Sequence, residues 1–197
     1  MIWGRKTTDA LKLWAIDLWN MRQQSGRWNL FRLNNFGHNT LVIDNQLQLV
    51  SGSVAVLRAE AAETGDCITV LDMTSVYSNV CSKAIRTATL AADGSFDIVD
   101  ELEGLKPGAS VVWGGMTRRK AVLQDGRGVR LSKEGAAHLD VISRGAGEWA
   151  LTDVTHPQPE FRGNSANRGI TRVTLSAVAP ANGQLSFHVT MKASDGE

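Results

Sequence analysis

Short β-like runs separated by turn residues fill the sequence from residue 40 to its end. The runs are rich in Val, Ile, Leu and Thr, and the gaps between them hold Gly, Asp and Asn. In residues 170–175 and 185–191 apolar and polar side chains alternate, which is the period of a strand with one face on a core. About a dozen such runs predict an all-β protein, a large antiparallel β-sandwich. The predicted strands are residues 40–44, 53–60, 67–73, 83–91, 95–100, 110–117, 120–124, 129–132, 136–143, 148–152, 170–179 and 184–192.

Glycine-containing turns predict where neighbouring strands connect. Asp93-Gly94 and Asn182-Gly183 each separate two β runs, and such dipeptides are the strongest short signal for a β-hairpin. Residues 125–128 form a longer turn of the same kind. The segment 156–168 has two prolines and little apolar content, so it is predicted to be a long loop, a class of segment that often carries function.

Residues 1–39 differ from residues 40–197, and we expect them to lead into the sandwich within one domain. Residues 8–19 fit a capped helix with one apolar face, and residues 15–19 fit a strand equally well. We therefore expect a short irregular or helical N-terminal segment, with helix confined to residues before 30. So many aromatic residues near a terminus usually cover a surface, such as one that an upstream piece would occupy. Four of the six Trp lie here: Trp3, Trp14, Trp19 and Trp28.

Length and charge narrow the classes of function. A chain of 197 residues is long enough for one domain with its own core. Lys and Arg total 21 and Asp and Glu total 20, so the net charge of +1 argues against bulk attraction to nucleic acid or to an anionic membrane. No apolar run approaches the roughly 20 residues of a membrane span. We expect no nucleic-acid partner and no membrane span, and the pairing of Cys67 with Cys81 stays open.

The most informative segment is residues 26–48, GRWNLFRLNNFGHNTLVIDNQLQ. Its Arg and Asn residues surround His38, and they fit two interpretations equally well. They can form a cleft edge that binds sulfate or carboxylate, because Arg pairs with such anions through two hydrogen bonds. They can also be solvated surface residues and turn caps. The residues are Arg27, Arg32, Asn34, Asn35 and Asn39.

Aromatic residues and a histidine complete the segment. Trp28, Phe31 and Phe36 can stack on sugar rings, although aromatics at strand spacing belong more often to the core. His38, taken alone, is a hydrogen-bonded structural histidine, since one imidazole does not make a metal site.

This segment resembles the Arg-Trp, Arg-x-Asn-Asn and His-Asn-Thr-Leu-x-Ile-Asp stretch of the heparinase II/III family of polysaccharide lyases. Residues 17–21 are similar to the loop that leads into that stretch in heparinase III-like members. Only about residues 17–48 are specific, although looser similarity covers most of the chain. The resemblance implies the C-terminal β-sandwich of an enzyme that also has an N-terminal (α/α) toroid.

The resemblance also implies a chemistry. Such enzymes cleave an acidic, uronic-acid-containing polysaccharide of the glycosaminoglycan type by β-elimination. The reaction needs a group that neutralises the carboxylate, a base for the C5 proton and an acid for the leaving oxygen. In the family the toroid supplies the neutraliser and a Tyr, and a His-x-His-x-Asp stretch supplies a base and metal ligands. Members are exported to the periplasm, secreted or held at the cell surface, although we do not expect residues 1–9 to act as a signal peptide, because no apolar stretch follows their basic pair.

Carried over to this sequence, the resemblance assigns few residues. His38 stands where the family has a metal ligand, so we expect zinc or another divalent metal in a full-length protein. No upstream His-x-His-x-Asp stretch accompanies it. We therefore expect no catalytic residue, no bound metal and no activity in this chain alone, with an acidic polysaccharide and the missing toroid as its partners. The alternative is a non-catalytic carbohydrate-binding or scaffold sandwich. The predicted substrate-binding residues are Arg27, Trp28, Arg32, Asn35 and Asn39.

Overall fold

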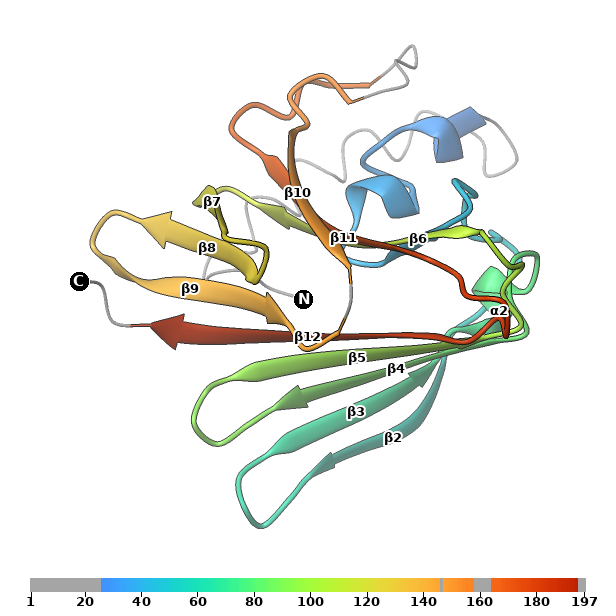
Figure 1. Ribbon diagram of the computed structural model, residues 1–197, viewed down its shortest axis with the longest axis horizontal. Coiled ribbons are helices and arrows are strands. Elements are labelled where there is room, and N and C mark those ends of the chain that lie inside the picture. The colour runs from blue at the N-terminus through green and yellow to red at the C-terminus, as the bar shows by residue number, and fades with distance from the viewer. Residues whose placement is uncertain (1–25, 146, 158–163, 195–197) are drawn as a thin grey trace.

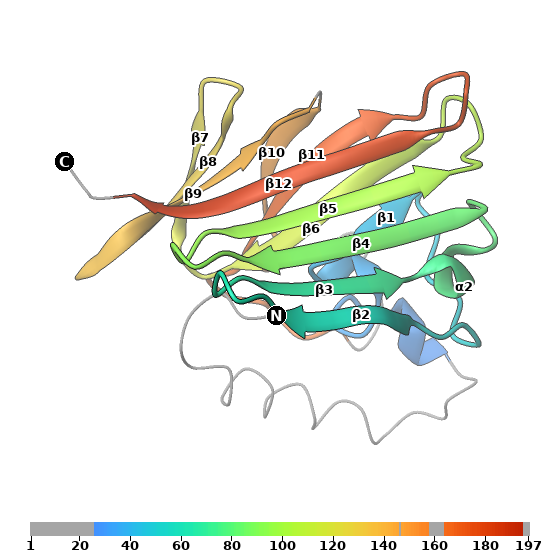
Figure 2. The ribbon, with the colours of Figure 1, turned by 90° about the horizontal axis from the view of Figure 1, so that it is seen from below.

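The computed structural model describes residues 26–145, 147–157 and 164–194. Its strands form two packed antiparallel sheets (Figures 1 and 2). The smaller sheet has the order β1 (Leu41–Ile43), β6 (Ser110–Thr117), β11 (Thr171–Val178) and β10 (Glu148–Asp153). The larger sheet has the order β2 (Ala55–Ala61), β3 (Cys67–Asp72), β4 (Lys83–Leu90), β5 (Phe96–Glu103), β12 (Leu185–Ser194), β9 (Ala136–Ser143), β8 (Gly128–Lys133) and β7 (Lys120–Gln124).

The prediction of an all-β sandwich is confirmed. Each of the twelve predicted runs overlaps one of the twelve strands among the described residues, with ends that differ by at most three residues. The prediction succeeded because one face of each inner strand must be apolar, and this leaves a period of two in the sequence. The possible helix or strand within residues 8–19 lies outside the described residues.

The core lies between the two sheets. Trp113 of β6 and Phe187 of β12 are fully buried from opposite sheets, and Tyr77 closes one end. The ring of Trp113 meets that of Trp149 from β10 edge to face, with centroids 6.2 Å apart. Alternate residues of β11, such as Val173 and Leu175, face this core, so the residues between them face outward.

One predicted hairpin is wrong. The Asp93-Gly94 turn joins β4 to β5, which pair with each other, as expected. Asn182-Gly183 instead lies between β11, which pairs with β6 and β10, and β12, which pairs with β5 and β9. Gly183 has a φ of +67° and its carbonyl accepts a hydrogen bond from the backbone of Leu105, so the turn is tight but carries the chain into the other sheet. A hairpin turn and a turn between layers need the same residues, and only the packing of the strands separates them.

The expectation that helix ends before residue 30 is also wrong. A 3-10 helix, η2, covers Asn35–Gly37, and a one-turn helix, α2, covers Thr74–Tyr77. The carboxylate of Asp72 accepts a hydrogen bond from the backbone of Thr74 at the start of α2. Helices this short bury one or two side chains and leave no periodic pattern in a sequence. None of the described helices is long and apolar enough to cross a bilayer.

Candidate functional site

The first part of the segment singled out in the sequence, residues 26–40, precedes β1 and lies outside the two sheets. It contains η1 (Gly26–Asn29) and η2, and it lies on the side of β6 that faces away from the larger sheet (Figure 1). The Asn34 side chain accepts a hydrogen bond from the backbone of Phe36 and donates one to the carbonyl of Trp28. Short-range bonds of this kind close the chain into a compact loop. We call residues 26–40 the outer segment.

Gly37 is required for this loop. A Cβ built on Gly37 would lie 2.0 Å from the carbonyl oxygen of Phe31, which belongs to the backbone and has no rotamer to escape into. A side chain before His38 would clash with the backbone, which explains why this position is a glycine. It lets two turns of the outer segment touch, and their contact sets the position of His38.

Asn35 holds the outer segment to the first strand. Its side chain is buried, and its amide nitrogen donates to the carbonyl oxygens of Leu41, at 3.2 Å, and Gln46, at 3.0 Å. These bonds satisfy backbone acceptors on both sides of β1. The structure thus explains Asn35 as a residue of the fold, and its role in substrate binding stays a prediction.

Arg32 joins the outer segment to the long loop. Its Nε donates to the Oδ1 of Asn167 at 2.6 Å, and its Nη2 donates to the carbonyl of Ala166 at 2.7 Å. The backbone nitrogen of Phe31 donates to the Oδ1 of Asn164 at 2.9 Å. The described C-terminal part of the loop that the sequence marked as a functional candidate, residues 164–168, is therefore bonded to the predicted site. Sequence reasoning did not assign Asn164 or Asn167, because their partners lie more than 130 positions away.

His38 is held in the neutral state. Its ring is half-buried, and its Nε2 lies 3.0 Å from the carbonyl oxygen of Arg32. A carbonyl can only accept, so Nε2 carries the proton in this contact. Burial lowers the pKa of His38 below its ordinary value of 6.5, and it outweighs the carbonyl of Arg32, which favours the charged ring.

A metal role for His38 can be tested against its surroundings. A metal-bound His commonly donates its other ring N–H to a backbone carbonyl, which is the contact that His38 makes with Arg32. A structural or catalytic zinc needs at least three protein ligands. Among the described residues there is no group of three or more His, Cys, Asp or Glu side chains that could hold a metal ion. The described residues fit one ligand of a metal site, not a complete site.

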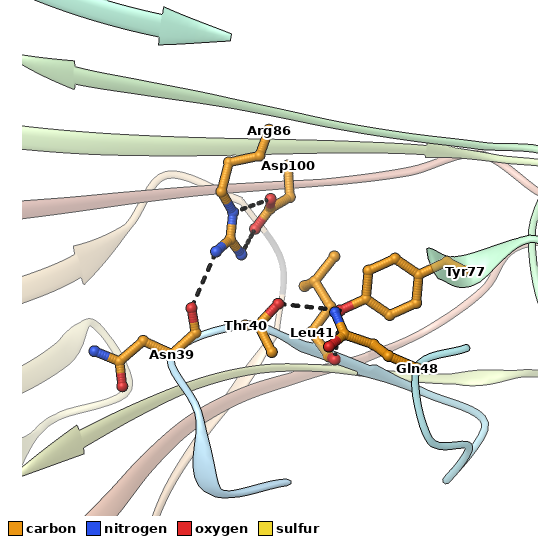
Figure 3. Close-up of polar contacts among 7 residues, drawn as sticks. All are labelled: Asn39, Thr40, Leu41, Gln48, Tyr77, Arg86 and Asp100. Atoms are coloured by element: carbon orange, nitrogen blue, oxygen red, sulfur yellow. Dashed lines mark hydrogen bonds and ion pairs between the residues drawn. The ribbon is translucent and has the colours of Figure 1, made fainter. Parts of the chain in front are cut away.

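Asn39 connects the outer segment to both sheets. Its side-chain oxygen accepts from the backbone of Met116 on β6, at 2.8 Å. Its carbonyl accepts from the Nη1 of Arg86 on β4, at 3.0 Å, so an arginine of the larger sheet reaches across the core to this segment (Figure 3). Arg86 is paired with Asp100 of β5 through Nε at 2.6 Å and Nη2 at 2.7 Å.

The Arg86–Asp100 pair is buried. Burial lowers the pKa of Arg86, but the charge and hydrogen bonds of Asp100 raise it more, so its net direction is above the ordinary value. Asp100 has no exposed side-chain area, and Arg86 keeps 10 %. Arg86 therefore stays charged between the sheets, and its hydrogen bond to the carbonyl of Asn39 ties the outer segment to the buried pair.

Tyr77 holds the start of β1, next to Asn39, through its hydroxyl. Its hydroxyl donates to the carbonyl of Leu41 at 2.8 Å and accepts from the side-chain amide of Gln48 at 2.8 Å, beside the hydroxyl of Thr40 at 3.0 Å (Figure 3). Burial raises the pKa of Tyr77 to about 12. This hydroxyl is occupied by the fold and does not face a ligand.

The remaining predicted binding residues lie at the start of the outer segment. Trp28 is half-buried in η1. Arg27 belongs to the same helix, and its side chain lies outside the described part of the structure. The structure therefore gathers Trp28, Arg32, His38 and Asn39 in one outer segment.

Comparison with known proteins gives a structural likeness only. No protein-family model matches the sequence. No curated protein matches it either. Solved structures do match. One is heparan sulfate lyase HepC from Pedobacter heparinus, with a TM-score of 0.64 and 12% identity over 81% of this chain. A mutant of that lyase matches with a TM-score of 0.65 and 13% identity over 100% of this chain.

A structure of heparinase III matches with a TM-score of 0.62 and 17% identity over 81% of this chain. The chain spans about a quarter of the length of these structures, from 24% to 28%. At such low identity the likeness establishes the fold, which is the sandwich fold of heparinase III-type structures.

Proposed function

We propose that this chain is the β-sandwich domain of a polysaccharide lyase that cleaves uronic-acid-containing acidic polysaccharide by β-elimination. The observation that carries the proposal is the coincidence of two independent signals. The fold matches heparan sulfate lyase and heparinase III structures. The segment with the sequence resemblance, residues 26–48, forms the compact outer segment and β1, and it carries His38 and Arg32 together.

In this proposal the chain binds and positions substrate, and parts of a longer protein outside these 197 residues supply the reacting groups. In β-elimination a base removes the C5 proton, the C4–oxygen bond breaks, a C4–C5 double bond forms, and an acid protonates the leaving oxygen. Tyr77 does not serve as that acid, because its hydroxyl is buried and bonded to the fold. We assign the base to a His-x-His-x-Asp stretch of the kind that the resemblance implies and the acid to a Tyr of a helical toroid domain, which packs against the outer segment.

His38 contributes by position. The carbonyl of Arg32 holds its neutral imidazole through a hydrogen bond. The side chain of Arg32 bonds Asn167 and so ties the long loop to the outer segment. In a complete enzyme His38 would supply one ligand to a divalent metal, and such a metal would hold neighbouring groups in place. An exported location, in the periplasm or outside the cell, agrees with a polysaccharide substrate.

Glycan binding by this 197-residue chain tests the proposal directly. We expect heparan sulfate, chondroitin sulfate, hyaluronan or alginate to retard the chain in affinity electrophoresis at low salt, and neutral dextran not to do so. The variant Arg27→Gln should weaken binding. The matched control Arg127→Gln, which removes the same charge at the exposed β7–β8 turn, should not. Failure to bind any acidic polysaccharide would contradict the proposal.

Turnover supplies the second test. The chain alone should release no unsaturated product from these polysaccharides, whereas a protein that carries this chain together with a helical toroid should release product that absorbs through its new double bond. The alternative function, a non-catalytic carbohydrate-binding sandwich, is favoured by the lack of a three-ligand cluster among the described residues. It predicts binding without turnover in both preparations.

A further inference from the structure

Arg172 lies on the outer face of the smaller sheet, beside the outer segment. Its neighbour Val173 faces the core, so Arg172 points the other way. Its guanidinium lies close to Gly114 of β6. A Cβ on Gly114 would be 3.3 Å from its Nη2, 3.4 Å from its Nε and 3.6 Å from the carbonyl oxygen of Thr40. Because Gly114 has no side chain, the guanidinium of Arg172 fits beside it, close to Thr40, which follows His38 by two residues.

The guanidinium has no partner. Its Nε and Nη2 are buried, and neither has a hydrogen-bond partner. Burial without a compensating charge lowers the pKa of Arg172. A buried cation with no acceptor is costly, and native structures seldom keep one without a reason. The residue as a whole is only half-buried, so a ligand can approach it from the solvent side.

Two other arginines of this chain show what that edge of the guanidinium binds. Arg86 uses Nε and Nη2 to hold both oxygens of Asp100. Arg130 uses the same two nitrogens to hold both oxygens of Asp140, at 2.8 and 3.1 Å. In each case the forked N–H groups match the two oxygens of a carboxylate. The same edge of Arg172 is the one that lacks a partner.

We propose that the Nε/Nη2 edge of Arg172 binds the carboxylate of a uronic acid residue in an acidic polysaccharide. This inference rests on the proposed function and adds a residue that the sequence resemblance did not assign. To reach a ligand, the guanidinium rotates away from Gly114. No hydrogen bond opposes this movement, because its Nε and Nη2 make none in the chain. The contact lies beside the outer segment, which carries the other predicted binding residues, so one sugar chain can reach both.

The test is a cycle that changes the carboxylate on the ligand and the arginine on the protein. The ligands are an unsulfated hexasaccharide of alternating glucuronic acid and N-acetylglucosamine, and the same hexasaccharide with its carboxyl groups reduced. The proteins are the wild-type chain, Arg172→Gln, Arg172→Lys and the charge-matched control Arg127→Gln, each checked for cooperative unfolding. Affinities are measured by calorimetry.

Loss of a charge-assisted, two-point contact should weaken binding of the acidic hexasaccharide on the order of tenfold in Arg172→Gln. Arg172→Lys should be intermediate, because a lysine keeps the charge but lacks the fork. Arg127→Gln should bind like the wild-type chain. The reduced hexasaccharide should bind wild type and Arg172→Gln equally, because the contact is already gone.

Other outcomes overturn the inference in distinguishable ways. If Arg172→Gln binds the acidic hexasaccharide as tightly as wild type, the inference fails alone, and the carboxylate belongs to another protein segment. Equal losses with both ligands would mean that Arg172 acts through shape rather than through the carboxylate. A loss seen only with an N-sulfated hexasaccharide would assign the site to sulfate. If wild type binds none of these ligands, the proposed function fails together with the inference.

Discussion

Arg86 and Arg172 lie on opposite sides of the smaller sheet and have opposite surroundings. Arg86 reaches from the larger sheet into the core and is saturated by Asp100 and by the carbonyl of Asn39. Arg172 lies on the outer face against Gly114, and two of its nitrogens have no acceptor. Both guanidinium groups lose much of their contact with water. In Arg86 protein acceptors replace the lost water, whereas Nε and Nη2 of Arg172 have none.

The difference separates a structural charge from a candidate functional one. Arg86 and Asp100, which we call the inner pair, satisfy each other within the fold. Removing either member should therefore destabilise the fold. The outer arginine contributes nothing to the fold through hydrogen bonds, so its removal should be tolerated, and a ligand can supply what the protein does not. The predictions below test this contrast.

The largest effect should come from breaking the inner pair. Asp100→Ala would leave the buried cation of Arg86 with one backbone acceptor, Asn39. Removing one member of a buried ion pair costs about 3–5 kcal/mol, so the free energy of unfolding measured with urea should fall by that amount.

The matched control breaks a partly exposed pair of the same geometry. Asp140→Ala removes the partner of Arg130, whose side chain is 43% exposed, and it should cost less than about 1 kcal/mol. If both variants lose the same stability, burial does not distinguish the inner pair, and the contrast with Arg172 loses its basis.

A smaller effect is expected where the outer segment touches itself. Gly37→Ala places a Cβ 2.0 Å from the carbonyl oxygen of Phe31, so the backbone must move. Overpacking of this kind costs about 1–3 kcal/mol. In the control Gly145→Ala the new Cβ would lie 4.0 Å from the carbonyl oxygen of Ser186, so this variant should melt within the error of wild type. A Gly37→Ala variant as stable as wild type would mean that the outer segment adjusts freely.

The sequence predicts the strands well because each strand's pattern is local. Residues 170–175 alternate between apolar and polar, and in β11 the apolar Val173 and Leu175 belong to the core cluster while the intervening Thr174 does not. The same pattern hides Arg172, since a polar residue at an outward position looks like any solvated side chain. Its special place depends on Gly114, a residue of another strand, and on the segment around Thr40.

The candidate site was predictable only in part, for the same reason. The resemblance of residues 26–48 drew attention to Arg32, His38 and Asn39, and these do lie in one segment. Their partners are long-range: Arg32 bonds Asn167, and Asn39 bonds Arg86 and Met116. No local rule connects such pairs, because they meet only when the two sheets pack. The hairpin prediction at Asn182-Gly183 failed for a similar reason, because the strands before and after this turn, β11 and β12, belong to different sheets.

Acid should weaken the outer region through His38. Its pKa in the folded chain lies below 6.5, first because of burial, although the carbonyl of Arg32 opposes the shift. Above pH 7 His38 is mostly neutral in both the folded and the unfolded chain, so it causes no loss of stability there. As the pH falls through 6.5 the unfolded chain takes up a proton that the folded chain resists, so the free energy of unfolding decreases.

The measurement compares wild type with His38→Gln between pH 8 and pH 5. Other titrating groups are common to both proteins, so the difference between their melting temperatures isolates His38. We expect wild type to lose more stability than the variant on acidification. Parallel curves would show that the ring titrates alike in both states, and the inferred neutral His38 would be wrong.

The smallest expected change has the opposite sign and completes the comparison. Arg172→Met keeps much of the side-chain volume against Gly114 and removes a cation whose Nε and Nη2 have no partner. Replacing a poorly compensated buried charge by an apolar side chain is often neutral or stabilising, so the free energy of unfolding should stay level or rise by up to about 1 kcal/mol. Arg86→Met, measured alongside, should lose stability because it leaves Asp100 unpaired in the core. Two arginine-to-methionine changes with opposite signs would show that one guanidinium serves the fold and the other does not. A clear loss in Arg172→Met would mean that the outer arginine already has a structural partner, and the ligand contact proposed for it would then have no free edge.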